Sequence, residues 1–217
     1  MYPNAYDGIK KIYLAEILTL ISTIIACVAT VVAAIGLKSA DGGAEDIGAA
    51  SAIVGGGAVL IISGIIILVA FILNILGISR ASKDEENFKK AMTWLLISLI
   101  GSLAAGFTKD GSFINLACDL VYQIGNILVT FYVIDGVISL ARKIGREDLV
   151  SRGTKLKGMI IAVYVIGFAL TLISGFMKQS DAMSVISGVL AVIALIVMIV
   201  AYVMYLKLLS GGKKMLA

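Results

Sequence analysis

Three polar side chains interrupt an apolar run in the segment "CDLVYQIGN", residues 118–126. In a helix with 100° per residue, Asp119, Gln123, Asn126 and Thr130 fall in one narrow sector about 16 Å long, with Tyr122 at its edge. We call these four residues the polar sector. A carboxylate beside two amides and a hydroxyl has the chemistry to bind a small polar solute or a cation. Asp119 would supply the charge, and hydrogen bonds would come from the rest of the sector and from Tyr122.

The polar sector also has a purely structural interpretation. Its side chains could hydrogen-bond to neighbouring helices, each bond contributing about 0.6 kcal/mol. An ionised aspartate at the centre of a bilayer costs roughly 2.5–3.5 kcal/mol, and Asp119, nearer one end of its run, should cost less. Under either interpretation, the sector should face the interior of a helix bundle or water rather than lipid.

Two other acids lie near the ends of apolar runs. Glu16 is close enough to the membrane surface to reach water, and Asp135 precedes Arg142 and Lys143 by about two helical turns. We interpret both mainly as interfacial acids, and Asp135 as one that can approach Arg142 or Lys143.

The residue types that most enzymes use are scarce. The chain has no histidine, which excludes an imidazole base, histidine-ligated haem and histidine-containing zinc sites. Cys27 and Cys118 form no CxxC pair, and no acid pair or metal cluster stands out. We therefore predict a protein that is not an enzyme, with no catalytic residue, no metal and no cofactor.

The composition defines the environment of these residues. Of the 217 residues, 60% are hydrophobic and 15% are charged, and the mean hydropathy is +1.05. Such a chain is typical of an integral membrane protein, and its length leaves no room for an ordinary soluble domain. We predict one polytopic membrane domain over residues 1–217.

Apolar runs between charges predict an all-α fold of six transmembrane helices. The runs lie near residues 12–36, 51–79, 91–107, 113–140, 156–176 and 183–207. Aromatic residues lie toward the ends of these runs, and we interpret them as membrane-interface belts. At one interface these are Tyr13, Trp94, Tyr132, Tyr202 and Tyr205.

The cations orient the predicted spans. Three of the 18 Lys and Arg residues, Lys38, Lys109 and Lys178, fall on one side, and the other fifteen fall opposite them. Because cationic loops resist translocation, we expect both termini to be cytoplasmic, in the inner membrane of a prokaryote. The cations flank separate spans, so they do not indicate nucleic-acid binding.

One group of cations lies in the predicted inner loop between residues 142 and 157. Each could add about 1 kcal/mol of attraction to an anionic lipid surface. The candidate lipid-headgroup contacts are Arg142, Lys143, Arg146, Arg152, Lys155 and Lys157.

A weak repeat marks the start of the odd-numbered spans. "DGIKKI" from Asp7, "ENFKKA" from Glu86 and "DLVSRG" from Asp148 share an acid followed by an apolar residue and a cation. We interpret the chain as three tandem helical hairpins. The alternative is that helix starts favour acids and inner loops favour cations without any duplication.

Small residues recur at four-residue spacing, as at Ser98, Ser102 and Gly106. Such stripes let membrane helices approach closely and predict a compact bundle. They are also compatible with a homo-oligomer or with partner membrane subunits.

The segment "ILGISRASKDEENFKKA", residues 75–91, ends one span with a glycine-containing turn before an acidic and cationic stretch. In this the chain resembles uncharacterised prokaryotic six-helix integral membrane proteins. The resemblance implies the architecture and supplies no mechanism.

Two function classes remain from the sequence. The first is a non-enzymatic small-solute transporter or solute-binding membrane subunit that uses the polar sector on the fourth helix. The alternative is a membrane-organising or accessory protein that acts through helix packing and partners. In that case the polar sector would be structural.

Overall fold

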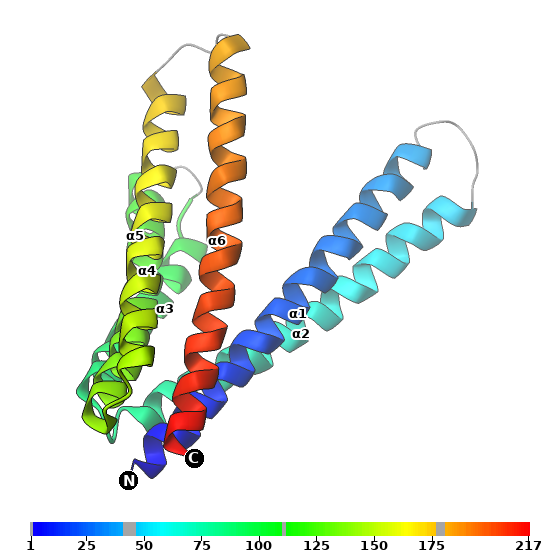
Figure 1. The fold of residues 1–217 in the computed structure, drawn as a ribbon. Helices are drawn as coiled ribbons and strands as arrows, with labels where there is room; N and C mark the ends of the chain where they lie inside the picture. Colours follow the sequence, from blue (N-terminus) through cyan, green and yellow to red (C-terminus); the bar gives the residue numbers. More distant parts are fainter. Residues whose placement is uncertain (1, 41–46, 110–111, 177–180) are drawn as a thin grey trace. The chain divides into compact units, whose positions relative to one another are not determined.

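The computed structural model describes residues 2–40, 47–109, 112–176 and 181–217, with side chains described for 2–32, 57–109, 112–166 and 192–217. These residues form six helices (Figure 1). They are α1 (Pro3–Ala40), α2 (Ile47–Ala81), α3 (Glu86–Gly106), α4 (Phe113–Ile144), α5 (Glu147–Phe176) and α6 (Asp181–Leu216). The predicted all-helical fold is confirmed for the described ranges.

Among the described residues, five helical segments are long and apolar enough to cross a membrane. They are Pro3–Val32, Gly57–Ala81, Glu86–Gly106, Phe113–Ile144 and Val192–Leu216. They support a multi-pass membrane protein. The predicted span at 156–176 falls within α5, but its side chains beyond residue 166 lie outside those described.

The helices extend beyond the apolar runs at their cation-rich ends. α1 begins at Pro3 rather than near residue 12, α5 begins at Glu147 rather than near 156, and α6 continues to Leu216 rather than ending near 207. The predicted spans are shorter than the helices because hydropathy measures only the apolar length. A helix continues through charged residues such as Lys, Arg and Glu, which have good helix propensity.

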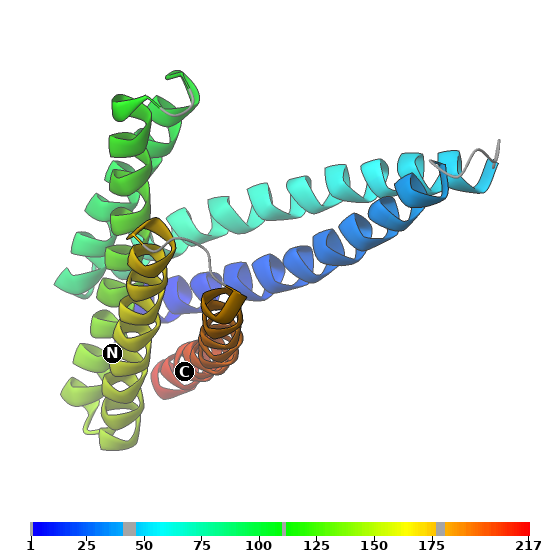
Figure 2. The same ribbon diagram turned by 90° about the horizontal axis from the view of Figure 1, so that it is seen from above.

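The chain divides into two compact units, Lys10–Gly77 and the remainder, Met1–Ile9 with Ile78–Ala217. In the first unit, α1 and α2 lie side by side in both views (Figures 1 and 2). Their buried positions include small residues at seven-residue spacing, Ala15, Ser22 and Ala29 on α1 with Ser63 and Ala70 on α2. The Ser22 and Ser63 hydroxyls are 2.6 Å apart, and each also lies within hydrogen-bonding distance of the other residue's carbonyl oxygen. This seam lets the two helices approach closely.

In the larger unit, α3 packs closely along α4. A Cβ atom added at Gly101 would lie 3.2 Å from the backbone of Cys118 and of Tyr122, and one at Gly125 would lie 2.6 Å from the Ser98 Cβ. Ser98 of the predicted small-residue stripe Ser98, Ser102 and Gly106 lies in this contact. Ser102 is exposed, and no atom lies within 4 Å of a Cβ at Gly106.

The buried core of this unit lies at the cation-rich ends of its helices. A glycine turn there joins α4 to α5: Gly145 has a φ of 78°, and the Arg146 N–H donates to the Ala141 carbonyl oxygen at 2.8 Å. This left-handed cap ends α4 and lets α5 return along it. The largest fully buried aliphatic side chains of the unit are Ile9, Ile78, Ile134, Leu140, Leu149, Leu156, Leu208 and Leu209.

Candidate functional site

The polar sector lies on one face of α4, as the helical spacing predicts. Gln123 and Asn126 are exposed, and Asp119 is partly buried. Within the described part of the chain, none of these three side chains has a hydrogen bond or ion pair. The Thr130 hydroxyl donates to the Asn126 carbonyl oxygen at 3.1 Å. Tyr122, at the edge of the sector, is 43% exposed.

The polar sector does not face α3. The α3 contact uses Gly125, which meets Ser98, and Gly136, where a Cβ would lie 2.5 Å from the Phe88 ring. Asn126 and Thr130 are turned from Gly125 by about 100–140° around the helix. Their polar groups therefore lie on a face of α4 that α3 does not cover.

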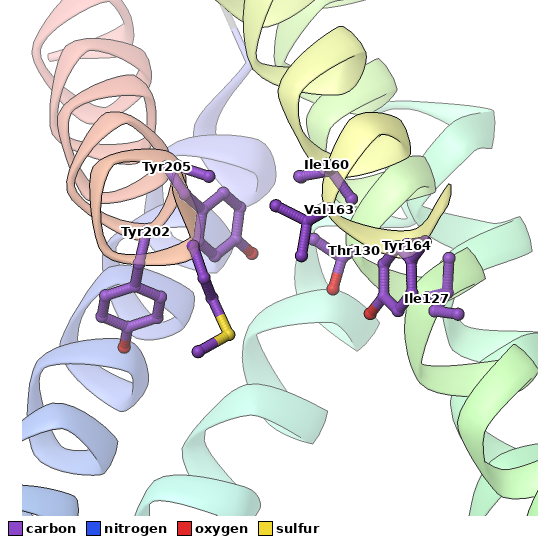
Figure 3. Close-up of a pocket in the computed structure, with 9 residues that line it drawn as sticks. Ile127, Thr130, Ile160, Val163, Tyr164, Tyr202 and Tyr205 are labelled. Carbon is purple, nitrogen blue, oxygen red and sulfur yellow. The ribbon is translucent and has the colours of Figure 1, made fainter. Parts of the chain in front are cut away.

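A pocket of about 210 Å³ lies between α4, α5 and α6 (Figure 3). Thr130, the last residue of the polar sector, belongs to its lining, whereas Asp119, Gln123 and Asn126 do not. The pocket is lined by Ile127 and Thr130 of α4, Ile160, Val163 and Tyr164 of α5, and Met198, Ala201, Tyr202 and Tyr205 of α6.

The pocket lining combines aliphatic side chains with three tyrosine rings and contains no ionisable acid or base other than tyrosine. Tyr164 is half exposed and Tyr205 is 7% exposed. Figure 3 shows Tyr202 and Tyr205 on one side of the pocket and Tyr164 with Thr130 on the other. Tyr205, which the sequence placed in an interface belt, is buried among the helices of this unit, so its ring contacts protein.

The interfacial acid Asp135 has a different partner from the one expected. Lys157 of α5 donates to both Asp135 carboxylate oxygens at 2.9 Å, so the predicted pairing with Arg142 or Lys143 is wrong. The turn at Gly145 returns α5 antiparallel to α4 and brings a residue 22 positions away to this carboxylate. The Lys157 ammonium also lies 5.4 Å from the centre of the Phe131 ring.

Glu16, the other predicted interfacial acid, is partly buried on α1. It belongs to the unit Lys10–Gly77, whereas the polar sector and the pocket belong to the other unit.

Glu85, which no sequence pattern singled out, has a side chain that is 6% exposed. It accepts a hydrogen bond from the Lys143 ammonium at 2.5 Å and one from the Asn87 amide at 3.1 Å. The Lys143 ammonium lies 6.0 Å from the centre of the Tyr2 ring. The position of Glu85 immediately before α3 was the available signal, because an acid is favourable at the positive end of a helix.

The adjacent residue, Asp84, holds the start of α1. Its carboxylate accepts from the Ala5 N–H at 2.8 Å and from the Asn4 amide at 2.9 Å. Arg80 pairs with Asp7 nearby. These contacts tie the first turns of α1 to the α2–α3 connection within one unit.

The six candidate lipid-headgroup residues separate into two groups. Lys143, Lys157 and Arg146 are engaged by Glu85, Asp135 and Asp148 respectively. Arg146 donates two hydrogen bonds to the Asp148 carboxylate, at 3.0 and 3.1 Å, and they lower the pKa of this carboxyl. The positive charge of the nearby Arg152 lowers it further. Arg142, Arg152 and Lys155 are exposed and have no ion pair in the described ranges.

Comparison with known proteins found no family model, no curated protein and no solved structure that matches this chain. Among the described residues, no group of three metal-ligating side chains is close enough to hold an ion.

Proposed function

We propose that this chain is a non-enzymatic membrane protein that binds a small solute on α4, as a transporter or as the solute-binding subunit of one. The observation that carries the proposal is the position of Thr130. This residue is both the inner end of the polar sector and part of the pocket lining. The polar sector would therefore lead a solute toward the pocket.

The hydrogen-bonding state of the sector supports this function. Asp119, Gln123 and Asn126 have no partner in the described chain, and an unsatisfied polar group in hydrocarbon costs several kcal/mol. Water or a polar solute would satisfy them. The pocket is smaller than the roughly 300–1,000 Å³ of sites for drug-sized ligands, so its occupant would be a small molecule.

The topology in which we place this site follows from the charge distribution. With fifteen of the 18 cations on one side, both termini would lie in the cytoplasm and the protein in a prokaryotic inner membrane. Asp119 would then lie toward the outer face and the pocket toward the inner half. The three tandem hairpins and the resemblance to uncharacterised six-helix membrane proteins remain predictions.

An accessory role through partner subunits is the second candidate. The exposure of Gln123 and Asn126 favours it, because a second membrane subunit could cover these amides and hydrogen-bond to them. The close contact of Ser98 with Gly125 does not favour it, since those small residues are already used within the chain.

Thiol labelling distinguishes the two candidates. Single cysteines at positions 119, 123 and 126 would be placed in a variant lacking Cys27 and Cys118. They would be labelled in intact cells with an impermeant maleimide. Lys109→Cys, in an exposed loop, is the positive control, and Val129→Cys, at a buried position on α4, is the negative control.

Solute binding along α4 predicts labelling at all three positions, decreasing from 119 to 126. Protection of 123 and 126 that persists in membranes opened to both faces would contradict the proposal. It would instead favour coverage by another protein.

A further inference from the structure

We propose that the ligand of the α4–α5–α6 pocket is a small organic cation, an ammonium group carrying apolar substituents. This inference rests on the proposed function, since it names the class of solute that the same site takes. Three features of the site support it: the charges along the path, the aromatic rings in the pocket, and the lack of ligands for other solute classes.

The charges along the path favour a cation. Residues 113–141, 158–176 and 182–206 contain Asp119 and Asp135 but no Lys or Arg. Asp135 is already paired with Lys157 at 2.9 Å. Within these three apolar segments, Asp119 is therefore the charge for which the described residues provide no ion pair, and its field, acting through a low-dielectric surrounding, attracts cations and repels anions.

The tyrosine rings supply a second attraction for an ammonium group. The face of an aromatic ring is electronegative, and it binds a cation within about 6 Å of the ring centre, most strongly where water is excluded. Tyr164 and the pair Tyr202 and Tyr205 line the pocket from two different helices (Figure 3). Quaternary ammonium groups are characteristically recognised by several such rings together.

The rest of the pocket suits alkyl or aryl substituents. Such groups can be buried against the aliphatic side chains of the lining, Ile127, Ile160, Val163 and Met198. A metal cation is disfavoured, because it needs about six oxygen ligands and the lining contains no carboxylate or amide side chain. A small anion would find no basic group there.

The test compares two molecules of nearly the same shape, phenyltrimethylammonium and its uncharged counterpart tert-butylbenzene. Binding would be measured by titration calorimetry on the full chain in nanodiscs of zwitterionic lipid, which does not concentrate cations at its surface. We expect the cation to bind at least roughly tenfold more tightly than the hydrocarbon.

Variants at Tyr164 locate the site. Tyr164 is half exposed, so its replacement should be tolerated in the fold. Tyr164→Leu removes the ring and should weaken cation binding by roughly tenfold, whereas Tyr164→Phe keeps the ring and should remain within about threefold of the parent. Tyr132→Leu is the control: it removes a partly exposed tyrosine from α4, outside the pocket lining and the polar sector, and should leave binding unchanged.

Two outcomes would overturn the inference. Equal affinity for the cation and the hydrocarbon would mean that the pocket selects for shape alone. Equal losses in Tyr164→Leu and Tyr132→Leu would mean that the cation binds elsewhere. The isosteric comparison uses the parent chain and is decisive even if a variant fails to fold. Cysteine labelling along α4 would still decide the proposed function separately.

Discussion

Lys157 of α5 donates to both carboxylate oxygens of Asp135 on α4, at 2.9 Å each, and thereby fixes the register of these two antiparallel helices. Both side chains are about one-third exposed, at 31% and 32%, so the pair is partly shielded from water. The same pair neutralises the second acid of α4, whereas Asp119 has no ion pair within the described ranges. The contact therefore serves both the packing and the charge selectivity that we propose.

Breaking this pair should destabilise the protein. We expect Asp135→Asn or Lys157→Met to lower the free energy of unfolding in detergent by about 1 kcal/mol. This lies between the values for exposed ion pairs and for buried charged hydrogen bonds. The double variant should lose less than the sum of the two single changes. Lys155→Met, at an exposed cation without an ion pair, is the control, and an equal loss there would contradict the assignment.

The contact of Gly125 with Ser98 predicts a steric effect. A methyl group at Gly125 would lie 2.6 Å from the Ser98 Cβ and 3.1 Å from its Cα, so α3 and α4 must separate to accommodate Gly125→Ala. We expect a loss of about 1–3 kcal/mol in the free energy of unfolding. Gly158→Ala, with no atom within 4 Å of the new methyl group, should be neutral or slightly stabilising. Equal behaviour of the two variants would argue against this packing.

The Asp84 carboxylate predicts a capping effect at the start of α1. Asp84→Ala removes the acceptor for the Ala5 N–H and the Asn4 amide, and should destabilise the protein by about 1 kcal/mol. Hydrogen exchange followed by mass spectrometry should show faster exchange in the first turns of α1, with α5 unchanged. Lys83→Gln, in the same connection, is the control. Unchanged exchange in α1 would show that Asp84 does not hold this end.

The pH dependence of Asp148 follows from its hydrogen bond with Arg146. That bond lowers the pKa of the folded carboxyl, so its contribution to stability is fully present above the ordinary pKa of about 4. The contribution is lost as the pH falls through the lower pKa of the folded state. The stability difference between the parent chain and Asp148→Asn should therefore be constant from about pH 5 to 7 and shrink below about pH 4. Thermal unfolding at several pH values checks this, and a difference that grew on acidification would contradict it.

Hydropathy predicts the helices well because a membrane-spanning backbone must satisfy its own hydrogen bonds, which leaves few alternatives to a helix. The common face of Asp119, Gln123 and Asn126 follows from that periodicity alone. The partner of Asp135 could not be predicted from the periodicity. Lys157 is brought near it by a turn that depends on the positive φ of Gly145.

The pocket was also missed. Tyr164 lies in an unremarkable apolar run, and Tyr202 and Tyr205 suited an interface belt equally well. Only the packing of three helices brings these rings together, and single-sequence periodicity carries no information about it.

The ion pairs also predict which cations contact lipid. Lys143, Arg146 and Lys157 are engaged by carboxylates, whereas Arg142 and Lys155 are exposed and have no ion pair in the described ranges. Each free cation near an anionic membrane surface adds about 1 kcal/mol of attraction. We therefore expect Arg142→Gln with Lys155→Gln to reduce the number of phosphatidylglycerol molecules retained in native mass spectrometry, and salt to reduce it in the parent chain. Lys109→Gln, at the opposite end of the helices, should have no effect. A similar reduction there, or retention that does not depend on salt, would show that the lipids are not held by these cations.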